Sequence, residues 1–138
     1  MNWYKKTSGS YWTKSQVFVD DGGNTYDISL LENLSKDLEI IDFPIDKLVK
    51  QLKEDVWSQG ENKLSPIDVL KNKEKYKKDF KDIINCTLER PILIKESDLI
   101  IIDGFHRLCK AIIEKQKTIK AKLVNKELLD KSKIDNFV

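Results

Sequence analysis

The chain carries its only histidine beside one of its two arginines, in the run Asp103-Gly104-Phe105-His106-Arg107. The other 23 basic side chains are all lysines. Arginine binds phosphate oxygens through two parallel donors, which lysine cannot reproduce. Because the chain uses lysine almost everywhere else, we expect Arg107 to serve a geometric purpose, and anion binding is the chemistry that its type suggests.

This run lies where a strand is expected to pass into a helix. Residues 99–102 are a buried-strand run, and apolar residues then recur at helical spacing from Phe105 to Ile113. The first turn of a helix offers unpaired amides and a positive dipole end, which favour phosphate. Gly104 leaves room for a ligand close to the backbone. A cationic side chain such as Arg107 in this first turn faces the positive end of the dipole, which costs about 0.3–1 kcal/mol. A bound anion would make the same charge favourable.

A second interpretation needs no ligand. Asp103 could cap the helix and Gly104 make the turn, with His106 and Arg107 pointing into water. The residues by themselves leave both interpretations open. Cys109 belongs to the apolar stripe of the helix, so we do not expect a nucleophile there.

The N-terminal half predicts short elements joined by turns. We expect a hairpin over residues 11–28, with strands at 17–19 and 25–26, followed by a helix whose apolar residues run from Ile28 to Leu38. A strand over 39–44 and a short helix or turn over 46–52 come next, then a loop over 57–63.

Ser65 starts the next predicted helix, because Pro66 and Asp68 complete a pattern like a capping box. Apolar residues continue this helix as far as Ile84, and the lysines from Lys71 to Lys81 are interpreted as its solvated face.

The C-terminal half predicts strands over residues 91–94, 99–102 and 118–124. We expect residues 99–102, the helix from Phe105 and residues 118–124 to form a right-handed crossover. In the last strand apolar residues alternate with lysines, which is typical of an edge strand.

Composition narrows the class of protein. The chain has 138 residues, enough for one domain, with 25 basic against 23 acidic side chains. No broad electrostatic attraction to nucleic acid is therefore expected. No apolar run is long enough to span a bilayer, and the first residues lack a secretory pattern. Cys86 and Cys109 fit no metal motif, so we expect reduced thiols in the cytoplasm and no zinc site.

The order of these elements resembles the ParB/sulfiredoxin superfamily between Ile40 and Val124. The blocks that carry the resemblance are Ile45-Asp46-Lys47-Leu48, Pro91-Ile92-Leu93-Ile94, Ile102 to Leu108, and Ile119 to Val124. It implies an α/β (α+β) fold, a small mixed sheet whose strand-helix-strand unit carries the phosphate-binding turn. We then expect a hairpin and helix extension over 1–38, the domain itself over 39–124, and a short tail or helix over 125–138.

The resemblance also implies site residues. Gly104, the amide of Phe105, His106 and Arg107 would hold the phosphates of ATP, ADP or another nucleotide. Lys75, on the preceding helix, is the nearest match to an assisting lysine.

Departures from the superfamily separate its branches. Phe105 stands where sulfiredoxins carry their reactive cysteine, so sulfinic acid reduction is excluded. About 14 residues follow Val124, too few for the helix-turn-helix region with which partition ParB proteins read DNA.

Asp-Gly-x-His-Arg resembles the free-serine kinases of this fold. That implies Asp103 as the base on an acceptor hydroxyl, Glu54 as a second carboxylate, and magnesium with the phosphates. The expected activity is phosphoryl transfer to a small hydroxyl compound or to water. The alternatives are a nucleotide-sensing module without turnover and a ParB-like nuclease that uses the lysines from Lys71 to Lys81.

Overall fold

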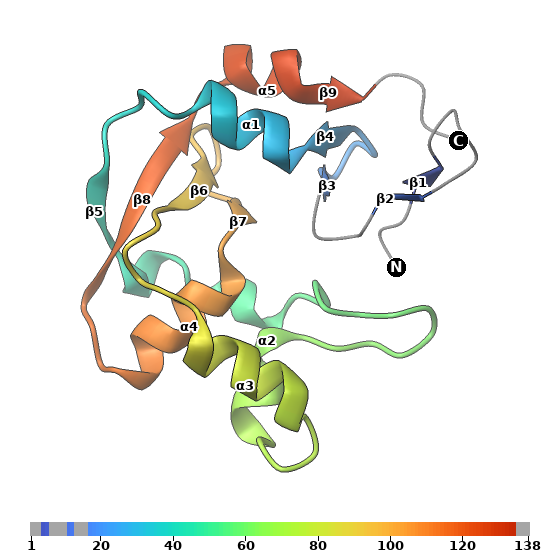
Figure 1. The fold of residues 1–138 in the computed structure, drawn as a ribbon, viewed down its shortest axis with the longest axis vertical. Helices are drawn as coiled ribbons and strands as arrows, with labels where there is room; N and C mark the ends of the chain where they lie inside the picture. Colours follow the sequence, from blue (N-terminus) through green and yellow to red (C-terminus); the bar gives the residue numbers. More distant parts are fainter. Residues whose placement is uncertain (1–3, 6–10, 13–16, 135–138) are drawn as a thin grey trace.

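A four-stranded mixed sheet forms the centre of the molecule. The computed structural model describes residues 4–5, 11–12 and 17–134 (Figure 1). The strands lie in the order β5-β8-β6-β7, and their bounds are Ile41–Pro44, Thr118–Val124, Ile92–Lys95 and Ile101–Asp103. β8 runs parallel to β6 and antiparallel to β5, and β6 runs antiparallel to β7.

Three helices and two short 3-10 helices cover one face of this sheet. These are η2 (Ile45–Lys47), η3 (Val49–Lys53), α2 (Pro66–Lys71), α3 (Lys77–Asn85) and α4 (Phe105–Ile113). The side chains of β6 alternate between faces, as the pleat requires. Ile92 and Ile94 therefore pack with Leu108 on this side, while Leu93 packs on the other.

The opposite face is covered by segments from both ends of the described chain. α1 (Ile28–Leu34) and α5 (Lys126–Ser132) lie side by side at the top of Figure 1. A three-stranded sheet, in the order β3-β4-β9, stands beside them, with bounds Val17–Val19, Thr25–Asp27 and Lys133–Ile134. A short pair, β1 (Tyr4–Lys5) and β2 (Tyr11–Trp12), forms a separate antiparallel ladder.

The local turn and cap predictions are confirmed. The β3–β4 turn is closed by Asp20, which accepts hydrogen bonds from the amides of Gly22 and Asn24. Ser65 and Asp68 form a capping box at the start of α2. The expected mixed α/β content is observed, with five α-helices in the part of the chain that the structure describes. The division at residues 38 and 124 stays a prediction.

Two predictions about the last long strand are wrong. β8 lies between β5 and β6 rather than at an edge, and it runs antiparallel to β7 without pairing with it. The parallel connection therefore starts at β6, not at β7. Interior lysine is tolerated because Lys122 donates through Nζ to the carbonyl oxygens of Ser35 and Lys36, which follow α1.

The predicted helix from Ser65 to Ile84 is two helices. α2 ends at Lys71, and a turn at Asn72 separates it from α3, so the lysines from Lys71 to Lys81 do not share one helix. Asn72 accepts the amide of Lys75, an alternative to continued helix that asparagine commonly offers. The break lets Val69 and Ile83 both reach the core. The six lysines are exposed, as predicted.

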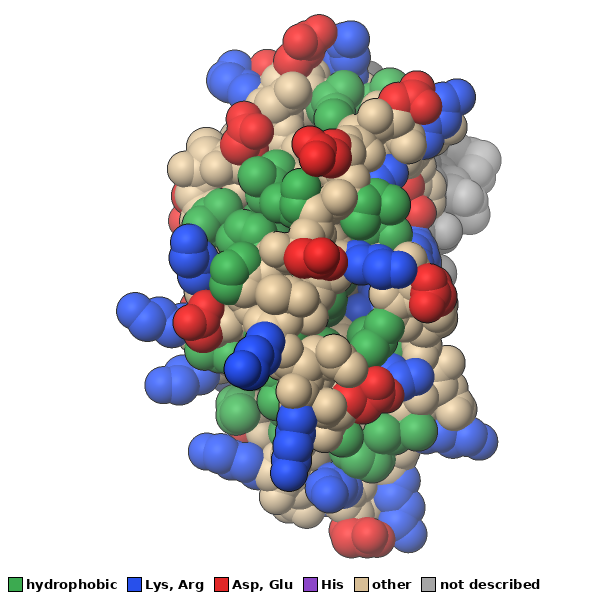
Figure 2. All heavy atoms as spheres, turned by 90° about the vertical axis from the view of Figure 1, so that its left-hand side faces the viewer, with side chains coloured by type: hydrophobic (Ala, Val, Ile, Leu, Met, Phe, Trp, Pro, Cys, Tyr) green, Lys and Arg blue, Asp and Glu red, His purple; other side chains and the backbone are tan. Residues whose placement is uncertain are grey.

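Charges of both signs are mixed on the β5 side of the molecule. Figure 2 shows acidic and basic side chains among apolar ones on this face, without a continuous basic surface. Among the helices of the described residues, none combines the length and the apolar character needed to cross a membrane.

Candidate functional site

Gly104 turns the chain from β7 into α4. Its φ of +127° lies in the region that L side chains rarely adopt. A Cβ at this position would stand 2.2 Å from Cγ2 and 2.6 Å from Cβ of Ile92. Glycine is therefore required both by the backbone conformation and by the close approach of β6.

The first turn of α4 has no side-chain cap. Asp27, Ser65 and Asn125 cap α1, α2 and α5 with a side-chain oxygen, whereas α4, which begins at Gly104, has no such cap, and neither does α3. The interpretation that Asp103 caps this helix is therefore wrong. Among the described residues, no acceptor is bonded to the amides of Phe105, His106 and Arg107.

Arg107 is buried, with only 6% of its surface exposed. Its Nη1 donates to the carbonyl oxygens of Arg90 (3.1 Å) and Pro91 (2.8 Å), and its Nη2 donates to Oδ2 of Asp103 (3.0 Å). Burial lowers the pKa of Arg107, and Asp103 opposes that shift. Arg107 thus fixes the start of β6 to the end of β7, and it does not point into water.

Both arginines of the chain meet at Asp103. Nη2 of Arg90 lies 3.8 Å from the same Oδ2 that Arg107 binds. Arg90 also pairs with Glu32 of α1. The cluster of Glu32, Arg90, Asp103 and Arg107 joins three separate segments of the chain and carries no net charge.

His106 stacks on Trp57, which comes from the loop after η3. The ring centroids are 4.5 Å apart, with an angle of 24° between the planes. Burial lowers the pKa of His106, and the carboxylates of Asp82, Asp79 and Asp103 partly oppose the shift. The folded chain therefore favours the neutral imidazole.

Stability is expected to fall as the pH is lowered through 6.5. Because the pKa of His106 is lowered from 6.5, the unfolded chain binds the proton more readily below that value. The free energy of unfolding then decreases until the pH reaches the folded pKa, with a slope of at most about 1.4 kcal/mol per pH unit. Urea unfolding between about pH 7.5 and 5 measures this dependence.

His106→Phe is the matched control, since it keeps a ring against Trp57 and removes the titration. Its stability should vary less than that of the wild type between pH 6.5 and the folded pKa of His106. Equal slopes for the two proteins would show that His106 is not the group responsible.

The remaining predicted site residues lie at different distances from this turn. Phe105 follows Gly104 directly and packs against the core. Glu54 is exposed at the end of η3, three residues before Trp57. Lys75 is exposed in the α2–α3 turn, where its ammonium group lies 5.4 Å from the ring of Tyr76. Among the described residues, neither Glu54 nor Lys75 forms a hydrogen bond or an ion pair with Asp103 or Arg107.

The two thiols are unsuited to nucleophilic chemistry. Burial raises the pKa of Cys109 to about 12, and burial also raises that of Cys86. Cys86 donates to the carbonyl oxygen of Ile83 (3.1 Å). These environments agree with the interpretation of Cys109 as a core residue.

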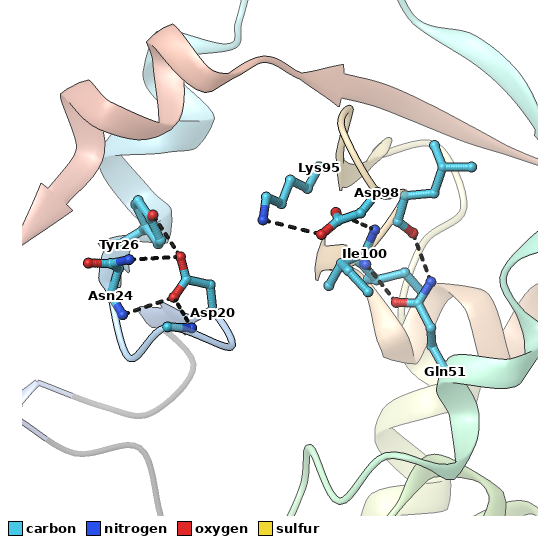
Figure 3. Close-up of polar contacts among 10 residues, drawn as sticks. Asp20, Asn24, Tyr26, Gln51, Lys95, Asp98 and Ile100 are labelled. Atoms are coloured by element: carbon cyan, nitrogen blue, oxygen red, sulfur yellow. Dashed lines mark hydrogen bonds and ion pairs between the residues drawn. The ribbon is translucent and has the colours of Figure 1, made fainter.

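Gln51 holds the strand that leads into the site. Its Nε2 donates to the carbonyl oxygen of Leu99 (2.8 Å), and its Oε1 accepts the amide of Ile101 (2.7 Å) (Figure 3). The side chain thereby supplies the two hydrogen bonds that a neighbouring strand would give. These two bonds join η3 to the start of β7, the strand that ends at Asp103.

A small hollow opens elsewhere, between the β3–β4 turn and the β6–β7 turn. It measures about 130 Å³, smaller than typical ligand pockets. Figure 3 shows three of its charged groups paired: Asp20 with Asn24 and Tyr26, and Lys95 with Asp98. We therefore place the candidate site at the start of α4.

Sequence reasoning missed Glu32, Trp57 and the part played by Arg90. The scarcity of arginine, which singled out Arg107, applies equally to Arg90 and could have suggested that the two meet. Glu32 gave no such signal, because it is one of many surface acids. Within the described residues, no cluster of three or more ligating side chains could hold a metal ion.

In comparisons with family models, curated proteins and solved structures, none matches this chain. The resemblance to the ParB/sulfiredoxin superfamily therefore stays a prediction.

Proposed function

We propose that the chain binds the phosphates of a nucleotide, ATP or ADP, at the first turn of α4. The observation that carries this proposal is the uncapped helix start at Gly104, with both arginines of the chain beside it. Unpaired amides and the positive end of the helix dipole stabilise phosphate. Trp57 and His106 form an aromatic wall next to the same turn.

Arg107 supports this binding by fixing the turn at Gly104 to the start of β6. Its donors already serve two carbonyl oxygens and Asp103, so a bidentate grip on phosphate would require these bonds to break. Removing buried charged hydrogen bonds is costly. The amides of Phe105 and His106 are therefore the donors that we assign to the ligand, and Arg107 holds the strand ends beside them in place.

The reaction that we propose is phosphoryl transfer to a small hydroxyl compound such as serine. Asp103 directs Oδ2 to Arg107, and Oδ1 has no hydrogen-bond partner among the described residues. Oδ1 would take the proton of the acceptor hydroxyl. The acceptor oxygen then bonds to phosphorus as the bond from phosphorus to the leaving nucleotide breaks.

Magnesium fits this site only as a companion of the nucleotide. Since the described residues form no cluster of three ligating side chains, the phosphates and water would supply the ligands. When bound, the ion neutralises charge that develops on the phosphates. A cytoplasmic location agrees with this use of a nucleotide and stays a prediction.

Calorimetric titration with ATP, ADP, CTP and GTP, with and without magnesium, tests binding. We expect one nucleotide to bind. In a separate unfolding experiment, that nucleotide at about 100 times its Kd should add roughly 2.7 kcal/mol to the free energy of unfolding. Absence of binding by all four would overturn the proposal. Binding without phosphorylated serine or nucleotide hydrolysis would favour the sensing module. No observation favours the nuclease.

Asp103→Asn separates binding from transfer. The amide oxygen can still accept from Arg107, so nucleotide binding should persist, while loss of the base should lower the rate of transfer about 100- to 10,000-fold. Asp98→Asn is the matched control before the same strand, where the carboxylate pairs with Lys95, and it should keep the wild-type rate. Equal rates in all three proteins would exclude Asp103 as the base.

A further inference from the structure

We infer that Arg90 is a second phosphate-binding arginine, and that Glu32 occupies it until the ligand arrives. This inference rests on the proposed function and adds to it a binding residue and an exchange of partners. It concerns a side chain of the segment before β6 and a helix, α1, that covers the opposite face of the sheet.

The two arginines differ in how freely they can bind. The Arg107 side chain is 8% exposed, and its Nη atoms bond three acceptors of the protein. The Arg90 side chain is 54% exposed, and its described partners are both carboxylates. Arg90 can therefore exchange partners at the surface, whereas Arg107 cannot without breaking buried bonds.

The position of Arg90 places it within reach of a ligand at α4. Its Nη2 lies 3.8 Å from Oδ2 of Asp103, and Arg107 bonds that same oxygen at 3.0 Å. Asp103 directly precedes the uncapped turn at Gly104. A phosphate held by the first-turn amides would thus meet a guanidinium group that is accessible from solvent.

Glu32 is the group that a phosphate would replace. It comes from α1, far from Arg90 in the chain, and its side chain is 36% exposed. An exposed ion pair contributes little to stability, so replacing Glu32 by a phosphate on Arg90 costs little free energy. A phosphate offers more negative charge than a carboxylate and accepts both donors of the arginine fork. The ligand therefore releases α1 from Arg90.

Arg90→Ala tests the binding role. The backbone carbonyl that Arg107 uses is retained in this variant, and the side chain is half exposed, so the fold should persist. With the nucleotide that the wild type binds, we expect the Kd to rise about tenfold or more. Arg90→Lys keeps the positive charge but loses the two parallel donors of the guanidinium group. Its Kd should lie between those of the wild type and Arg90→Ala.

Glu32→Gln tests the exchange, and here the expected change has the opposite sign. Removing the competing carboxylate should lower the Kd about two- to fivefold, by the energy of an exposed pair. Glu89→Gln is the matched control. It removes the carboxylate one residue before Arg90, which pairs with Lys120 at 3.1 Å, and it should leave the Kd unchanged.

The outcomes separate this inference from the proposed function. If the wild type binds no nucleotide, the proposed function fails and the inference falls with it. If the wild type binds and Arg90→Ala has the same Kd, only the inference is overturned. A Kd that rises in Glu32→Gln, or that falls equally in Glu89→Gln, would also overturn it, since Glu32 would then not compete for Arg90.

Discussion

Gly104→Ala is expected to lower the free energy of unfolding by about 2–5 kcal/mol, a large part of the stability of a typical domain. Two costs add. A non-glycine residue at φ of +127° is strained by about 1–2 kcal/mol. The new Cβ also stands 2.2 Å from Ile92, and overpacking of this kind costs about 1–3 kcal/mol. Urea unfolding of purified protein measures the sum.

Gly60→Ala is the control that isolates the conformational cost. Gly60 also has a positive φ, of +60°, but a Cβ added there would have no other atom within 4 Å. We expect a loss of only about 1–2 kcal/mol there. If Gly104→Ala loses no more free energy of unfolding than Gly60→Ala, the inference that Gly104 packs closely on β6 is wrong. Loss of nucleotide binding in Gly104→Ala would not by itself identify the site, because the turn is distorted.

Arg107→Met is expected to lower the free energy of unfolding by about 2–4 kcal/mol. Methionine keeps much of the apolar length of the side chain but leaves the carbonyl oxygens of Arg90 and Pro91 without their donor. Asp103 also loses its buried partner, although 27% exposure of its side chain lets water compensate in part. Chemical denaturation at pH 7 gives the value.

Asp103→Asn should cost much less, because an amide oxygen can replace Oδ2 as the acceptor of Arg107. A double-mutant cycle of Arg107→Met with Asp103→Ala, which does remove the acceptor, measures the coupling between the two residues, and we expect about 1–3 kcal/mol for a contact of this kind. A loss below about 1 kcal/mol in Arg107→Met would contradict the structural role, since surface substitutions have effects of that size. Such a small loss would mean that the Arg107 side chain is free to bind a ligand.

The local features of the fold could be predicted because they depend on neighbouring residues. The Asp20 turn and the Ser65 capping box each follow from side-chain chemistry within about four residues. The strand-to-helix junction at Gly104 was equally clear, since apolar runs of two different periods meet there. The structure confirms this junction: β7 ends at Asp103 and α4 begins at Phe105, at the candidate site.

Long-range relations could not be predicted in the same way. The alternation of lysine in β8 resembles an edge strand, and only the carbonyl oxygens after α1 explain why Lys122 lies in the interior of the sheet. Likewise, Arg107 carries no sign in the sequence that its donors would be taken by Arg90 and Pro91. Such partners depend on how distant segments pack.

The pairing of Tyr26 in β4 with Lys133 in β9 has a consequence for the order of folding. Contacts between segments this far apart in the chain form late, because a large loop must close first. During synthesis, α1 has no α5 to pack against until residues 126–132 leave the ribosome. We therefore expect α1 to dock late, after both β8 and α5 have been made, with Arg90 open to solvent until Glu32 reaches it.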